Sequence, residues 1–236
     1  ELIGWLYQYY ISEKAEKIRD TKKVVKPEDV AAMTQFFTPH WIVRYLVENS
    51  LGRLWMLNHP NSKLIEQMDY YIKPEQPETD FLKISKPEEI KICDPACGSG
   101  GMFVQSIKFI ENNHGNKKEV SIYGQEYTNT TYKLAKMNLA VRGISANLGD
   151  IAADTFFKDQ HPDLKADYIM ANPPFNQKQW RADNELTDDP RWAGFEVPPT
   201  GNANYAWIML MISKLSEHGT AGFVLANGSM SSSTSG

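Results

Sequence analysis

From about residue 88 onward, the chain alternates short apolar segments with helical segments, and this alternation constrains the fold most. Strands are predicted at 90–93, 120–124, 146–149, 167–171 and 221–226. Apolar side chains with helical spacing lie between them, and we interpret them as core: Phe103, Val104, Ile107 and Ile110; Leu134, Met137 and Val141; Trp207, Ile208, Met211 and Leu215. Strands separated by helices pair in parallel, so the sequence predicts an α/β sheet with helices on both faces.

The first predicted strand ends in a glycine-rich turn, Asp94-Pro95-Ala96-Cys97-Gly98-Ser99-Gly100-Gly101, which leads directly into a predicted helix. Glycine has no Cβ, so such a turn lets the backbone approach a ligand closely. The turn is not a P-loop, because no Gly-Lys-Ser/Thr follows. It is not the dinucleotide fingerprint either, because Phe103 stands where a third glycine is needed. The alternative is a tight turn without a ligand.

Two further acids follow the next two predicted strands. Glu126 follows the second strand, where nucleotide-binding sheets place a carboxylate for ribose hydroxyls. Asp150 follows the third strand, and it or the neighbouring backbone could accept a hydrogen bond from a cofactor adenine. Either acid could instead be a solvated helix cap. Together with Asp94, the three acids at successive strand ends predict one nucleoside-shaped site.

A sharp helix start is predicted upstream, in Gln35-Phe36-Phe37-Thr38-Pro39. Thr38 is the expected N-cap and Pro39 the first helical residue. A helix N-terminus presents free N–H groups and positive potential, which suits the carboxylate of an amino-acid-like ligand. An ordinary cap without a ligand is the alternative.

Asn172-Pro173-Pro174-Phe175 directly follows the fourth predicted strand. An amine conjugated to an aromatic ring attacks a methyl donor only if its lone pair is localised, and two hydrogen-bond acceptors would do this. The Asn172 side-chain oxygen and the Pro173 carbonyl can be those acceptors, and Phe175 can stack on an extruded base. The alternative is a simple turn.

Residues 176–200 carry Trp180, Arg181, Trp192 and Phe195 without a helical or strand period. A loop of this length is uncommon in a compact domain unless it has a function. The segment is expected either to fold over extruded DNA or to be disordered, because it also contains many acidic residues.

These motifs resemble, in order, those of adenine-specific (N6) DNA methyltransferases, and most closely the modification subunit of type I restriction-modification systems. The likeness covers residues 35–50 and 90–230, and includes Gly201-Asn202-Ala203-Asn204. It implies a Rossmann-like, seven-stranded sheet that binds S-adenosyl-L-methionine. The implied cofactor residues are Gln35, Phe37, Thr38, Pro39, Asp94, Ala96, Cys97, Gly98, Ser99, Gly100, Glu126 and Asp150. The implied catalytic residues, around the target adenine, are Asn172, Pro173, Pro174 and Phe175.

The resemblance also implies a domain organisation. Residues 1–30 are expected to form a short N-terminal helical segment, and 31–236 a methyltransferase domain with an insertion at 58–86. The chain is expected to be a fragment that lacks the last sheet strands and the target-recognition part. Residues 1–60 also resemble larger stand-alone or phage-defence adenine methylases.

The formal net charge of -4 argues against tight binding of DNA by this chain alone. Double-stranded DNA is the expected substrate, with a specificity subunit and a restriction subunit as partners. No stretch of apolar residues is long enough to span a membrane, and a cytoplasmic protein is expected. Cys93 and Cys97 are expected to be buried thiols, and the scattered histidines predict no metal.

Two other functions remain open. A protein-glutamine methyltransferase must activate an amide nitrogen with the same pair of acceptors, although such sites usually carry Tyr where this chain has Phe175. A non-catalytic interaction module with this fold is the second alternative, against which the intact motifs argue.

Overall fold

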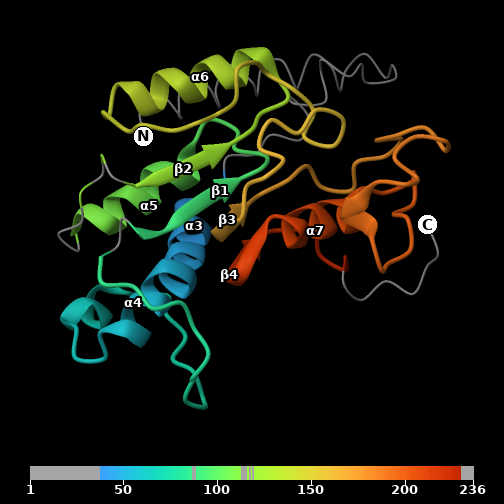
Figure 1. The fold of residues 1–236 in the computed structure, drawn as a ribbon. Helices are drawn as coiled ribbons and strands as arrows, with labels where there is room; N and C mark the ends of the chain where they lie inside the picture. Colours follow the sequence, from blue (N-terminus) through green and yellow to red (C-terminus); the bar gives the residue numbers. More distant parts are fainter. Residues whose placement is uncertain (1–37, 87–88, 113–115, 117, 119, 230–236) are drawn as a thin grey trace.

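The computed structural model describes residues 38–86, 89–112, 116, 118 and 120–229 (Figure 1). The predicted helical segment 1–30, Gln35 and Phe37 lie outside these residues. The helices are α3 (His40–Val47), the π-helix η1 (Glu48–Gly52), α4 (Arg53–Asn58), the 3-10 helices η2 (Lys63–Gln67) and η4 (Pro190–Trp192), α5 (Gly101–Asn112), α6 (Asn129–Ala140) and α7 (Asn204–Ser213). The strands are β1 (Lys91–Asp94), β2 (Ser121–Gly124), β3 (Ala166–Ala171) and β4 (Leu215–Phe223).

The four strands form one parallel sheet in the order β2-β1-β3-β4. This confirms the predicted α/β fold. The strand predicted at 146–149 is reduced to a single parallel bridge between Asn147 and Tyr123. Asn147 exchanges two backbone hydrogen bonds with β2, to the Ile122 carbonyl (2.8 Å) and from the Gly124 N–H (2.9 Å). The chain leaves the sheet directly afterwards, at Gly149, which has a positive φ of 75°.

The last strand starts earlier than predicted. β4 begins at Leu215, not at residue 221, because Leu215 pairs with Ala166 ahead of the polar residues 216–219, and hydrophobicity does not reveal this pairing. An irregularity interrupts this pairing between Ala166 and Tyr168, and the regular register runs from Thr220 to Phe223.

Both faces of the sheet are covered, because alternate residues of each strand point to opposite sides. Ile92 and Met170 belong to one buried cluster with α3, α5 and part of α6. Cys93 and Ile169 belong to a second cluster with α7 and the 176–200 loop. Figure 1 shows α3 and α5 on one side of the sheet and α7 on the other. Cys93 and Cys97 are both free and buried, as expected.

The predicted core face of α6 was wrong. Met137 is 50% exposed and Val141, just after the helix, is 65% exposed. The buried side chains are instead those of Thr131, Tyr132, Ala135 and Leu139. Two of these four residues are polar and one is small, so a count of large apolar residues selects the wrong face of the helix.

The insertion expected at 58–86 connects α4 to β1, and side-chain amides hold its backbone. The Asn58 amide donates to the Leu82 carbonyl (2.9 Å) and its oxygen accepts from the Ile84 N–H (3.1 Å). Asn49 makes the same pair of contacts with the carbonyl of Tyr70 (2.7 Å) and the N–H of Ile72 (2.8 Å).

The 176–200 loop is ordered around two buried tryptophans, so disorder was the wrong expectation. Trp180 packs between Phe156 and Trp192, with ring centroids 4.6 and 6.2 Å away, and its N–H donates to the Pro199 carbonyl (2.8 Å). The Arg181 guanidinium donates to four backbone carbonyls of the same loop. Trp180 and Arg181 therefore hold the loop together internally.

Candidate functional site

The order of the strands creates a crevice beside β1. From β1 the chain passes to β2 on one side, whereas β3 lies on the other side of β1. In open parallel sheets, ligands bind at such a switch point, outside the carboxyl ends of the strands. Asp94 ends β1, Glu126 follows β2 by two residues and Asn172 follows β3 directly. The fold therefore brings these three side chains to the same edge of the sheet.

The glycine turn needs two of its glycines for their backbone conformation. Gly98 and Gly100 have positive φ values of 52° and 80°, which residues with a Cβ rarely adopt. A Cβ on Gly100 would contact Leu139 at 3.4 Å, whereas a Cβ on Gly98 would meet nothing within 4 Å. The turn is thus packed on its Gly100 side and has open space on its Gly98 side, where a ligand could approach the backbone.

Glu126 is buried and holds this turn. One carboxylate oxygen accepts from the Gly98 N–H (3.2 Å) and the other from the Thr128 N–H (2.8 Å). It is 6% exposed, so the solvated-cap alternative is wrong for this residue. Burial raises its pKa, and the two backbone N–H groups oppose that rise.

Asp94 is a buried carboxyl whose pKa is raised to about 8. Burial is the main cause, and the nearby Glu126 charge adds to it, while a hydrogen bond from the Ala96 N–H (3.0 Å) acts in the opposite direction. Two acidic groups are therefore held in one poorly hydrated place. Such an arrangement favours a ligand that brings positive charge or hydrogen-bond donors.

Asp150 does not share the burial of Asp94 and Glu126. It is exposed, and its backbone N–H donates to the side-chain oxygen of Gln160 (2.9 Å). Gln160 also accepts from Ile151 N–H (3.2 Å) and donates to the Ile151 carbonyl (2.8 Å), so it fixes this turn. Sequence reasoning missed Gln160, which lies ten residues further along a segment without periodicity.

Thr38 does not cap the helix as predicted. α3 begins at His40, and Pro39 is its N-cap residue, without a side-chain hydrogen bond. The Thr38 hydroxyl instead accepts a hydrogen bond from the Asn172 side-chain amide, with Nδ2 and Oγ1 2.9 Å apart. The residue is thus turned toward the end of β3 and away from its own helix. This contact joins segments that are 134 residues apart.

The Asn172 side chain has one satisfied end and one unsatisfied end. Its nitrogen donates to Thr38, whereas its oxygen Oδ1 is buried and has no hydrogen-bond partner among the described residues. Pro173 is fully buried, and Phe175 is 38% exposed. A buried acceptor without a partner is uncommon in folded proteins and usually has a reason, such as a ligand.

A cluster of three asparagines supports the residue after Phe175. Asn176 has a positive φ of 50°, and its N–H donates to the side-chain oxygen of Asn204 (3.0 Å). Its own side-chain oxygen accepts from the amides of Asn204 (2.9 Å) and Asn202 (3.2 Å). Asn204 is buried and opens α7. The sequence contains these asparagines in Gly201–Asn204, but nothing in it indicates that Asn176 is their partner.

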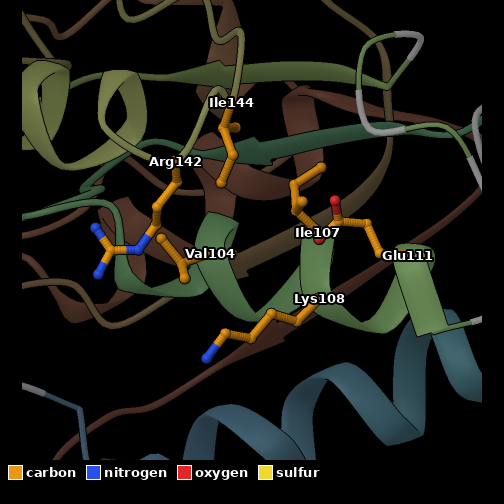
Figure 2. Close-up of a pocket in the computed structure, with 6 residues that line it drawn as sticks. All are labelled: Val104, Ile107, Lys108, Glu111, Arg142 and Ile144. Carbon is orange, nitrogen blue, oxygen red and sulfur yellow. The ribbon is translucent and has the colours of Figure 1, made fainter.

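A surface hollow elsewhere does not coincide with this site. Figure 2 shows it between α5 and the segment after α6, lined by Val104, Ile107, Lys108, Glu111, Arg142 and Ile144. None of these is a predicted site residue. Within the described ranges, no group of three or more His, Cys, Asp and Glu side chains is arranged to hold a metal. Every helix in the described part is too short or too polar to span a membrane.

Comparison with known proteins identifies relatives over much of the chain. The HindI methylase subunit, a type I restriction enzyme subunit of Haemophilus influenzae, is 50% identical over 164 residues, which are 70% of this chain and 37% of that protein. The adenine-specific methyltransferase BrxX of Escherichia coli is 47% identical over 119 residues, 47% of this chain and 10% of that protein. The chain thus spans well under half the length of these relatives.

A solved structure has the same fold. It is the methyltransferase subunit of a type I restriction-modification system from Streptococcus thermophilus, with a TM-score of 0.61 and 21% identity over 83% of this chain and 35% of that one. A model of the family described as N-6 DNA Methylase matches residues 25–236. The predicted resemblance is confirmed, and the chain belongs to the N-6 DNA methylase family.

Proposed function

We propose that this chain is the catalytic part of a DNA methyltransferase that transfers a methyl group from S-adenosyl-L-methionine to the N6 amine of adenine. The observation that carries the proposal is the buried, unpartnered oxygen of Asn172 at the carboxyl end of β3. It is an acceptor that lacks a donor, and an exocyclic amine has two N–H donors to offer.

The described residues suit the methyl donor at the neighbouring strand ends. The open side of Gly98 would admit it, Glu126 would accept from its ribose hydroxyls, and the buried Asp94 would face its positive charge. Ala96, Cys97, Ser99 and Gly100 would contribute turn backbone, and Asp150 would lie near its adenine. Thr38 and Pro39 would lie at its methionine end, to which the family resemblance also assigns Gln35 and Phe37, both outside the described residues. When bound, S-adenosyl-L-methionine supplies an electrophilic methyl group.

The protein side chains would act by orientation. Asn172 Oδ1 and the Pro173 carbonyl would each accept from one N–H of the target amine, which localises the nitrogen lone pair toward the methyl group. Pro174 would keep the turn rigid. The partly exposed Phe175 would stack on the extruded base and offset part of the unstacking energy. The amine nitrogen gains the methyl group and loses one proton, without a covalent enzyme intermediate.

Double-stranded DNA would be the substrate of an assembly and not of this chain alone. The net charge of -4 argues against tight phosphate binding by this chain alone, so basic surface would come from a local cluster, from other parts of the protein or from partners. The relatives are named as subunits of type I restriction enzymes and as an adenine-specific methyltransferase, so a specificity subunit, with a restriction subunit, is the proposed partner set. A cytoplasmic location would follow from such a role.

The test is methyl transfer by the full-length protein, together with its specificity partner. It would be incubated with unmethylated genomic DNA and S-adenosyl-L-methionine labelled in the methyl group, and the DNA would then be hydrolysed to nucleosides. We expect the label in N6-methyl-2′-deoxyadenosine. Label in protein glutamine would instead support the amide alternative, and absence of transfer would support the non-catalytic module.

Asn172→Ala tests the acceptor itself. We expect it to abolish transfer while binding of S-adenosylhomocysteine stays within about threefold of wild type, because the substitution removes only the amine acceptor. Asn58→Ala is the matched control, since it removes a partly buried amide that holds the 58–86 insertion and is not part of the proposed site. Equal loss of transfer and cofactor binding in Asn172→Ala would contradict the assignment.

A further inference from the structure

We propose that Thr38 is a positioning residue that sets which way the Asn172 amide faces, and that it makes this orientation depend on the occupied cofactor site. The inference rests on the proposed function, which it deepens. Sequence similarity assigns Thr38 to the cofactor alone, whereas the structure shows its hydroxyl oxygen 2.9 Å from the nitrogen of Asn172.

The orientation of this amide decides whether the site can work. A side-chain amide has an acceptor at one end and two donors at the other, with nearly the same shape. With Oδ1 toward the target, it accepts from the amine. Turned by 180°, it would present N–H groups to the N–H groups of the amine and would repel it. Some contact must therefore distinguish the two ends of the Asn172 side chain.

Among the described residues, Thr38 Oγ1 is the only hydrogen-bond partner of the Asn172 side chain. In the observed orientation, Thr38 accepts from one N–H and the buried Oδ1 remains for the target. In the turned orientation, the hydroxyl would donate to Oδ1, and neither N–H of Asn172 would have a partner. Each orientation thus makes one hydrogen bond with Thr38, so a hydroxyl that is free to donate or accept does not by itself fix the amide.

The hydroxyl of Thr38 is also what connects the two sites. A hydroxyl has one donor and two acceptor positions, so Thr38 can accept from Asn172 while donating its proton elsewhere. It lies two residues before His40, at the N-terminus of α3, where the proposed anionic end of the methyl donor would be held. Once its proton is donated to that ligand, Thr38 can only accept from Asn172. The turned amide is then left without any partner there.

This contact couples the cofactor site to the adenine site. The acceptor for adenine becomes fixed only when the methyl donor is present, so extrusion of a base is favoured after cofactor binding. Because coupling between two sites is reciprocal, an extruded base should also tighten cofactor binding by the same factor. A hydrogen-bonded chain from ligand to Thr38 to Asn172 also polarises each member and makes Oδ1 a better acceptor.

The experiment compares Thr38→Val, which keeps the shape and removes the hydroxyl, with Thr38→Ser, which keeps the hydroxyl. Both are made in the full-length protein with its specificity partner. Three quantities are measured: kcat for N6-methyladenine formation at saturating S-adenosyl-L-methionine, the Kd of S-adenosylhomocysteine by calorimetry, and the Kd of DNA with and without saturating S-adenosylhomocysteine. The last ratio reports coupling without any turnover.

We expect Thr38→Val to lower kcat about tenfold at saturating cofactor, which corresponds to one lost hydrogen bond in the transition state. S-adenosylhomocysteine should tighten DNA binding in the wild type and in Thr38→Ser, and this effect should be absent in Thr38→Val. If Thr38→Val does not fold, as judged by its melting curve, Thr38→Ala carries the same expectation.

An unchanged kcat in Thr38→Val, with only a higher KM for the cofactor, would overturn the inference, because Thr38 would then be a cofactor contact alone. Equal coupling in wild type and Thr38→Val would also overturn it. These results differ from a failure of the proposed function, in which the wild-type protein itself forms no N6-methyladenine.

Discussion

Binding of the methyl donor should depend strongly on pH because of Asp94. This carboxyl is 2% exposed and its pKa is raised to about 8, mainly by burial and further by the Glu126 charge. At pH 7, roughly nine in ten unliganded molecules would therefore carry a protonated Asp94. A positively charged ligand favours the ionised carboxylate, so binding must release this proton.

The magnitude follows from the position of this pKa. With a pKa of about 8, the ionised fraction falls about fivefold from pH 8 to pH 7 and about tenfold from pH 7 to pH 6. The affinity for S-adenosyl-L-methionine should fall by the same factors and level off above pH 8. Calorimetry in buffers with different ionisation enthalpies measures both the affinity and the protons released. At pH 7 we expect about one proton per ligand bound.

Asp94→Asn is the control, since it keeps the shape and cannot ionise. It should bind the ligand weakly and with little dependence on pH. Equal affinity of the wild type at pH 6 and pH 8, or the same pH slope in Asp94→Asn, would refute the reasoning.

The same carboxyl should affect stability with a defined sign. Between about pH 4 and pH 8, the unliganded native protein retains a proton that the unfolded chain has lost, so the free energy of unfolding falls as pH rises. Asp94→Asn should therefore raise the melting temperature at pH 8 and leave it nearly unchanged at pH 4. A gain that is equal at both pH values would contradict this origin.

Two other expectations concern the segments that follow the Asn172–Phe175 turn. Asn204→Asp places an acceptor, in place of a donor, against the side-chain oxygen of Asn176. It should lower the free energy of unfolding by about 1–3 kcal/mol and reduce kcat without weakening cofactor binding. An unchanged denaturation midpoint would argue against the observed pairing. Trp180→Ala should lower the free energy of unfolding by about 3–5 kcal/mol, as for other buried aromatic residues. Phe195, in the same loop, is 62% exposed, so Phe195→Ala should change the free energy of unfolding by less than about 0.5 kcal/mol. Similar losses of stability in the two variants would show that the buried ring of Trp180 does not hold the loop.

The elements that could be predicted are those in which the apolar periodicity of the sequence matches the side chains that the structure buries. The apolar segments around β1, β2 and β3 are strands with buried side chains, with β1 and β3 in the interior of the sheet, and α5 buries Phe103, Ile107 and Ile110 as its spacing predicts. α6 could not be predicted as well, because its surroundings select Thr131 and Ala135 for burial. The order of the 176–200 loop could not be predicted for a related reason. The indole N–H groups of Trp180 and Trp192 donate to carbonyls of the loop's own irregular backbone, which no periodic pattern indicates.

For the site, the sequence alone determined the residue types and their order along the chain: a glycine turn after one strand, an acid after the next, and Asn172 with its prolines after a third. These are properties of short segments, which local sterics and hydrogen-bonding capacity decide. Only the tertiary structure decided which groups meet. The sheet order β2-β1-β3-β4 brings Asp94, Glu126 and Asn172 to one edge, and it turns Thr38 from a helix cap into the partner of Asn172. A hydroxyl can bond to any neighbour within reach, so its partner depends on packing between segments 134 residues apart, which no local pattern encodes.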